Sequence, residues 1–195
     1  MSVAMLAVEP SVPLDIAPAT PLPSLGALWN AVASVPDPEI PAVSVVELGI
    51  LRRIAWDVAD PSTVLVTVTP TYSGCPATEL IATSIREALT AAGVPRVRID
   101  IELAPAWTTD WITAEGRRKL REFGIAPPDG SKAVSTSARI DVAGISPLRR
   151  STVVVPCPRC DSPRTQLVSQ FGSTACKAHY RCLDCLEPFD YFKPH

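Results

Sequence analysis

The sequence carries little charge, and neither sign dominates. Only 19% of its 195 residues are charged, with 18 Lys and Arg against 20 Asp and Glu, so the formal net charge is −2. Because 47% of the residues are hydrophobic, a wholly disordered chain is excluded. A chain without a basic excess has no general attraction to nucleic acid or to an anionic membrane. We therefore expect a folded protein with neither of these partners.

Signals for membrane insertion and export are also missing. No run of 18 apolar residues occurs, so no transmembrane helix is expected. Residues 1–23 are rich in proline, nearly uncharged, and lack the basic leader and apolar core of a secretory signal. We expect a flexible proline-rich arm here. In the cytoplasmic protein that this predicts, the six cysteines are reduced, which favours metal binding or chemistry over disulfides.

Composition divides the rest of the chain into three parts. Residues 24–125 have the apolar periodicity of a compact domain. Residues 126–150 are rich in Pro, Gly and Ser, as a linker is, and include a candidate strand at 138–142. Residues 151–195 hold five of the six cysteines. We therefore expect one domain followed by a small cysteine-rich module.

The pattern of residues 24–125 predicts an α+β fold. We expect a helix after Ser24, an extended segment over 45–57, a strand over 64–69, a helix over 76–92, a strand over 96–103 and a helix over 113–123. This order predicts a small sheet with helices packed mainly on one face. Trp107 and Trp111 lie in the loop before the last helix, where completing a core is a commoner role than binding a partner.

Two CxxC pairs mark the C-terminal part. Cys157 and Cys160 form the first pair, and Cys182 and Cys185 form the second after 21 intervening residues. Two such turns can direct four thiolates at one point, and Zn²⁺ suits a tetrahedral site of this kind. Four candidate strands surround the pairs, at 152–155, 166–171, 178–181 and 189–192. We therefore expect a zinc ribbon. A module of only about 45 residues has a small hydrophobic core, and structural zinc would compensate for this.

Alternatives remain for this module. An iron–sulfur cluster or disulfides could use the same four sulfurs. Cys176 or His179 could replace a member of the second pair, although Cys176 lies six residues before Cys182, which favours a non-ligand or exchangeable thiol. His179 falls in a predicted strand, where a surface or core histidine is the commoner outcome. Acidic residues offset the basic ones of the module, which favours docking to protein over binding to nucleic acid.

The sixth cysteine, Cys75, follows a predicted strand and precedes the helix that we expect to begin at Pro76. Free amides and the dipole at a helix N-terminus favour an anion, so we expect a lowered thiol pKa. The thiolate could ligate a metal, accept sulfur or attack an electrophile; the alternative is a small buried residue that caps the helix. Residues 24–125 contain no histidine to act as the base of a cysteine enzyme.

A cluster needs about four ligands, which Cys75 alone cannot supply. A second subunit, a client protein or the carboxylates of Asp37 and Glu39 would have to provide the others. The alternative for Asp37-Pro38-Glu39 is a rigid turn with solvated carboxylates.

Several of these motifs together resemble known families. The tracts DPEI at 37–40, VVELG at 45–49 and SGCP at 73–76 are similar to the small α+β domain of cytosolic iron–sulfur assembly factors. The tracts PTYSGCPATE and PAWTTDWITAEGRRKLREFGIAPP, with the cysteine-rich C-terminus, resemble the PaaD family of phenylacetate-degradation proteins. The resemblance covers roughly residues 24–195.

This resemblance implies an accessory protein rather than an enzyme. The role that the resemblance implies is to help mature or maintain the metal centres of the multicomponent phenylacetyl-CoA epoxidase, a di-iron oxygenase with a [2Fe–2S] reductase. It implies that Cys75 is the functional thiol, with Asp37 and Glu39 beside it, and that a transient iron–sulfur cluster or iron is carried. Subunits of the oxygenase complex are the implied partners, and a homodimer stays open. The alternative is a non-catalytic structural subunit of the same complex.

Overall fold

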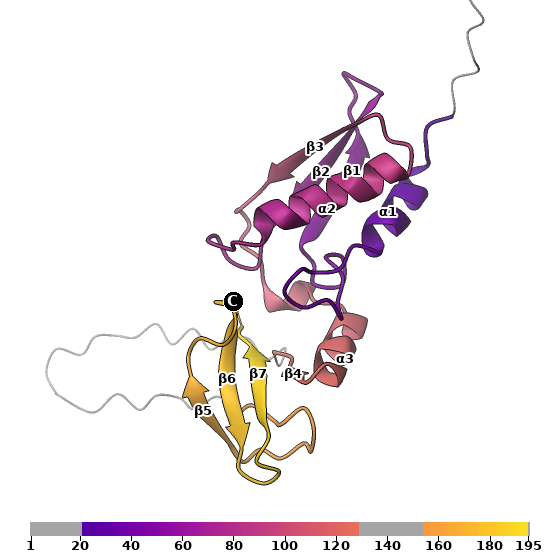
Figure 1. Ribbon diagram of the computed structural model, residues 1–195. Coiled ribbons are helices and arrows are strands. Elements are labelled where there is room, and N and C mark those ends of the chain that lie inside the picture. The colour runs from indigo at the N-terminus through magenta and orange to yellow at the C-terminus, as the bar shows by residue number, and fades with distance from the viewer. Residues whose placement is uncertain (1–20, 129–153, 195) are drawn as a thin grey trace, which may run out of the picture.

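Residues 21–128 and 154–194 are described by the structure, a computed structural model (Figure 1). Most of the predicted arm and linker, including the strand at 138–142, lies outside the described residues, and the predicted domain boundaries stay predictions. Within the described part of the chain, no helix is both long and apolar enough to cross a membrane.

The first half contains a three-stranded sheet with two helices on one face (Figure 1). Its elements are α1 (Leu25–Ala33), β1 (Leu51–Trp56), β2 (Thr63–Val68), α2 (Thr78–Ala91) and β3 (Arg96–Ile101). The strand order is β1-β2-β3, with β1 antiparallel to β2 and β2 parallel to β3. The parallel pair requires a crossover, which α2 supplies. The predicted α+β class is confirmed.

The side-chain pattern explains these elements. Ser24 caps α1, because its Oγ accepts a hydrogen bond from the Ala27 amide at 3.2 Å. Helix α1 buries Leu28 and Val32, and α2 buries one apolar face. In β2 every second residue is buried, as expected for a strand with one face on the core. The helices thus cover the apolar face that β2 presents.

Residues 45–49 form a turn, so the prediction of an extended segment is correct only from Leu51 onward. The Glu47 carboxylate accepts from the Ser44 amide at 2.8 Å, and Ser44 Oγ accepts from the Glu47 amide at 3.2 Å. This reciprocal capping stabilises a turn although the run is apolar. Gly49 has φ +70°, and a Cβ there would lie 2.6 Å from the Trp111 carbonyl oxygen, so only glycine fits.

A short 3₁₀ turn, η1 (Thr109–Trp111), and helix α3 (Ala114–Glu122) pack against this turn. Thr113 caps α3 by accepting from the Gly116 amide at 2.9 Å. Gly116 allows close approach, because a Cβ there would lie 2.8 Å from the Glu47 carbonyl oxygen. Lys119 of α3 pairs with the Glu47 carboxylate at 2.6 Å. The turn and α3 therefore form one packed unit.

The C-terminal sheet has four strands in the order β4-β7-β6-β5. They are β4 (Ile125–Ala126), β5 (Thr165–Ser169), β6 (Lys177–Cys182) and β7 (Pro188–Phe192). Strands β5, β6 and β7 are antiparallel neighbours, as expected for a ribbon, and β4 pairs parallel with β7. The described part of the predicted strand at 152–155 is not a strand. The sequence did not reveal β4, which joins the end of the first half to the ribbon sheet.

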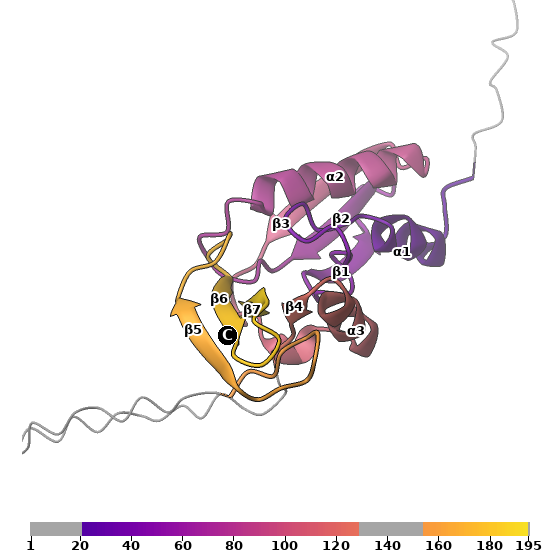
Figure 2. The same ribbon diagram turned by 60° about the horizontal axis from the view of Figure 1, so that its bottom comes forward.

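The ribbon lies at the end of the first half where α3 is found (Figures 1 and 2). Trp107 is 3% exposed, donates from Nε1 to the Leu48 carbonyl at 2.9 Å, and has its ring 5.8 Å from that of Phe192. Arg121 of α3 pairs with Asp161 of the ribbon. The prediction that Trp107 completes a core is confirmed, and this core includes Phe192 of the ribbon.

Candidate metal sites

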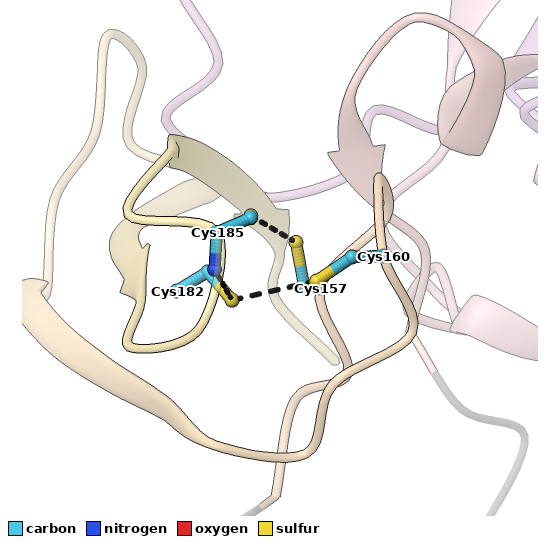
Figure 3. A group of neighbouring side chains, drawn as sticks. All are labelled: Cys157, Cys160, Cys182 and Cys185. Atoms are coloured by element: carbon cyan, nitrogen blue, oxygen red, sulfur yellow. Dashed lines mark hydrogen bonds between the residues drawn. The ribbon is translucent and has the colours of Figure 1, made fainter.

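Four cysteines of the ribbon point toward one another (Figure 3). The sulfurs of Cys157, Cys160, Cys182 and Cys185 all lie within 4.8 Å of one another, with Cys157 to Cys185 at 3.8 Å and Cys160 to Cys182 at 3.6 Å. Four sulfurs bound to one Zn²⁺ at about 2.3 Å in a tetrahedron are about 3.8 Å apart. The donor set and its spacing therefore fit a metal such as zinc.

The turns that carry these cysteines have the geometry of metal knuckles. The amides of Asp184 and Cys185 donate to the Cys182 sulfur at 3.4 and 3.5 Å, which stabilises a thiolate. One residue after each pair, Asp161 and Leu186 adopt positive φ angles of 62° and 64°. These left-handed residues turn the chain back after each pair.

Cys176 and His179 lie outside this group of four sulfurs. Cys176 immediately precedes β6, whereas Cys182 ends it. The Nδ1 atom of His179 lies 3.3 Å from the Asp190 carboxylate. The CxxC pairs therefore account for all four cysteines of the group.

Cys75 lies in the loop before α2, but not at the helix N-cap. The helix begins at Thr78 with Ala77 as N-cap, and Thr78 binds the Cys75 carbonyl through its amide at 3.3 Å and its hydroxyl at 2.8 Å. The predicted lowering of the thiol pKa is wrong. Partial burial raises the pKa of Cys75, and hydrogen bonds from Ala77 and Thr78 oppose this. The negative charges of Glu39 and Asp37 raise the pKa further.

Asp37 holds the acidic turn in shape. Its carboxylate is buried, and Oδ1 accepts from the amides of Glu39 and Ile40 at 2.9 and 2.8 Å. Burial raises the pKa of Asp37, while these two amides and the charge of Lys177 oppose the shift. The alternative of a turn with solvated carboxylates is therefore wrong for Asp37, whose side chain is buried and bound by two backbone amides. Asp37 thus positions Glu39, whose side chain is half-buried.

A second thiol, that of Cys176, lies beside Glu39, and nothing in the sequence indicated this position. The Sγ of Cys176 lies 3.9 Å from Oε2 of Glu39, and the residue is 6% exposed. Burial raises the pKa of Cys176, Thr174 lowers it by a hydrogen bond, and the charges of Glu39 and Cys75 raise it. We call Cys75, Cys176 and Glu39 the thiol cluster. No spacing signal could have indicated it, because its members come from three distant segments.

The same side chains act on Tyr72, from the loop that leads to Cys75. Burial raises the pKa of Tyr72, and the charges of Cys75, Cys176 and Glu39 raise it further. Three acidic groups thus lie close enough to Tyr72 to act on it together.

The buried ammonium of Lys177 lies 3.5 Å from the Asp190 carboxylate.

Two family models match the chain, one in each half. Residues 26–101 match an iron–sulfur cluster assembly protein, and residues 144–193 match the PaaD zinc beta ribbon domain. The chain is 44% identical over 176 residues to a protein of Escherichia coli (strain K12) assigned as one of the subunits of 1,2-phenylacetyl-CoA epoxidase. The match covers 88% of this chain and 93% of that protein. The chain belongs to the PaaD family. The resemblance inferred from the motifs is confirmed.

Other proteins are similar to the first half of this PaaD-family chain. An Fe-S protein maturation auxiliary factor of Porphyromonas gingivalis is 36% identical over 88 residues, which is 45% of this chain and 81% of that protein. A crystal structure of a domain of unknown function, DUF59, from Bacillus anthracis is 23% identical with a TM-score of 0.45. It covers 49% of this chain and 89% of that one.

Proposed function

We propose that this PaaD-family protein assists the assembly or maturation of metal centres in the multicomponent phenylacetyl-CoA epoxidase of phenylacetate degradation. Its similarity to a subunit of such an enzyme and to an Fe-S protein maturation factor supports this role. The observation that carries the proposal is the half-buried thiol of Cys75 next to the acidic turn of Asp37 and Glu39. The protein acts in the cytoplasm as an accessory protein and not as an enzyme.

In this proposal Cys75 binds iron or an iron–sulfur cluster transiently and passes it to the client. Because burial raises its pKa, the free thiol is protonated at pH 7, and binding must displace that proton. The lost proton lowers the net affinity relative to a preformed thiolate, which favours release to a client. Asp37 keeps the acidic turn in place through its two amide contacts, so that Glu39 stays beside the thiol.

The ribbon serves as the docking module in this proposal, with Zn²⁺ held by Cys157, Cys160, Cys182 and Cys185. Zinc there supplies only structure, because all four positions of a tetrahedral ion are filled by sulfur. The ribbon packs through β4 and Trp107 against the half that carries Cys75. A client protein bound to the ribbon would therefore lie beside the donor thiol.

The alternative of a purely structural subunit rests on the placement of the family beside the oxygenase complex and on the Trp107 and Trp111 loop as a binding surface. Trp107 is buried, and the guanidinium of Arg52 lies 3.4 Å from the centre of the Trp111 ring. The two indoles are therefore engaged within the chain, which removes the second of these grounds and leaves the first.

The proposal is tested by Cys75→Ser in cells that depend on this protein for epoxidase activity, with Ser73→Ala in the same loop as the matched control. We expect Cys75→Ser to lower epoxidase activity at least tenfold while the purified variant keeps its zinc. Ser73→Ala should retain full activity, because Ser73 is exposed. Full activity of Cys75→Ser would reject the proposal. Recovery of this protein at fixed stoichiometry with active epoxidase would favour the structural subunit instead.

A further inference from the structure

The ribbon contributes its own thiol to the region around Cys75. Cys176 is a member of the core cluster that is otherwise built from the first half of the chain and Phe192, and Cys75 packs against that same cluster. Cys176 immediately precedes β6, while the zinc ligand Cys182 ends it. At about 3.3 Å per residue, the two lie ~20 Å apart along the strand. Strand β6 therefore reaches from the ribbon metal site to the Cys75 loop.

Backbone and side-chain contacts fix the position of Cys176. Its carbonyl oxygen accepts from the Lys193 amide at 2.9 Å, one residue beyond β7, and its sulfur lies 3.1 Å from the Thr174 hydroxyl. The packing of the Phe192 ring, at the end of β7, against the tilted ring of Trp107 holds this end of the sheet on the first half. The sulfur is thus presented to Glu39 at 3.9 Å by the packing of the ribbon.

The composition of the thiol cluster suits one kind of ligand. Two sulfurs and one carboxylate oxygen match the preference of a borderline divalent transition ion such as Fe²⁺. A sulfur and an oxygen bound tetrahedrally to such an ion at about 2.3 and 2.1 Å are ~3.6 Å apart, close to the separation of Cys176 and Glu39. The buried ammonium of Lys177 lowers the pKa of Cys176 by its charge, but it is itself paired with the Asp190 carboxylate at 3.5 Å. A metal cation would supply the charge that two thiolates and a carboxylate need.

We propose that Cys176 is the second metal ligand of the Cys75 site, and that Cys75, Cys176 and Glu39 together bind a divalent transition ion. This inference rests on the proposed function and extends it, because the ribbon then both docks the client and supplies a ligand. Binding replaces two S–H bonds with two metal–sulfur bonds and releases two protons to water, with no change of oxidation state. Among the described residues, the four ribbon cysteines are the one group of three or more candidate ligands whose atoms all lie within 4.8 Å of one another, so binding an ion would have to draw the three side chains of the thiol cluster together.

The test titrates the full-length, zinc-loaded protein with Co²⁺ alone under anaerobic conditions. We expect one Co²⁺ per chain, with thiolate-to-cobalt absorption and release of two protons per ion at pH 6.5, where thiols are protonated and carboxylates are not. Cys176→Ser should halve this absorption and weaken binding at least tenfold. Glu39→Gln should weaken binding but keep the absorption of two thiolates. His179→Ala, on the same strand, should bind as the parent does.

Each outcome decides the inference. Cobalt absorption of Cys176→Ser equal to that of the parent, or release of a single proton by the parent protein, would overturn it. The zinc content of Cys176→Ser reports whether this variant folds. Proton release is measured on the parent protein, so it tests the inference even if Cys176→Ser does not fold. If Cys75→Ser loses cobalt while Cys176→Ser keeps it, the proposed function stands and this inference fails. If the parent binds no Co²⁺, this inference fails, and the cell assay of Cys75→Ser decides the proposed function by itself.

Discussion

The sulfur of Cys176 lies 3.9 Å from the carboxylate of Glu39, although 137 positions separate the two residues. One belongs to the ribbon and the other to the acidic turn of the first half. Their contact means that the ribbon, besides carrying its own four-cysteine group, also contributes a side chain to the region around Glu39 in the first half. The predictions below test the parts on which that arrangement depends.

The first prediction concerns Asp37. Asp37→Ala removes the acceptor of two amide bonds and should lower the free energy of unfolding by about 1–3 kcal/mol. Asp37→Asn keeps an oxygen for both amides and removes a buried charge, so its stability at pH 7 should equal or exceed that of the parent. Denaturant unfolding of both variants measures this. If Asp37→Ala and Asp37→Asn lost the same free energy of unfolding, the negative charge of Asp37 itself would be needed for stability.

The raised pKa of Asp37 also predicts a pH dependence. Because the pKa is higher in the folded than in the unfolded chain, the stabilisation by this group is complete below its unfolded value near 3.8 and is lost as pH rises through the folded value. The parent should therefore lose stability relative to Asp37→Asn as the pH rises from 4 to 7. A difference in unfolding free energy between the parent and Asp37→Asn that stayed constant from pH 4 to 7 would contradict the raised pKa of Asp37.

Gly116 provides a test of the packing between α3 and the turn at 45–49. Alanine is normally the better helix residue by about 1 kcal/mol, but a Cβ at Gly116 would lie 2.8 Å from the Glu47 carbonyl oxygen. We expect Gly116→Ala to destabilise the protein by about 2 kcal/mol or more. Gly26→Ala in α1 is the control, since its Cβ would meet nothing closer than 3.9 Å and should be neutral or stabilising. Thermal unfolding of the two variants compares them.

Metal analysis tests the ribbon. We expect one zinc per chain, lost in Cys182→Ser and retained in Cys176→Ser, because only the first of these sulfurs belongs to the group of four. Removal of zinc by a chelator should unfold the ribbon strands, whose own buried core is small. Iron and acid-labile sulfide that disappear with Cys182→Ser would instead identify a cluster on these sulfurs.

Alkylation tests the environment of Cys75. Because burial raises its pKa and only the thiolate reacts, the rate of iodoacetamide modification at Cys75 should rise at higher pH than in the unfolded chain. Glu39→Gln should move the profile to lower pH, since the charge of Glu39 raises that pKa. Mass spectrometry of the Cys75 peptide follows the reaction. If the modification rate of Cys75 rose at the same pH as in the unfolded chain, or at a lower pH, the raised pKa of Cys75 would be contradicted.

Local patterns predicted the parts of the fold and site that depend on local chemistry. The Ser24 cap, the alternation of β2 and the two CxxC pairs all act through neighbours in sequence. The turn at 45–49 escaped prediction because its apolar residues Val45 and Leu48 are buried in the core although they belong to no strand. The pKa of Cys75 was misjudged because burial outweighs the amide contacts that its position suggested. The contact of Cys176 with Glu39 depends on how the ribbon packs, which no spacing encodes.

The most direct test of the central claim is the iron content of the epoxidase made in cells that carry Cys75→Ser. The oxygenase and reductase would be purified from these cells and from cells with Ser73→Ala, and iron measured in each component. We expect at least one of the two components to lose most of its iron with Cys75→Ser and both to keep it with Ser73→Ala. Full iron occupancy of both components with Cys75→Ser would contradict the proposed function.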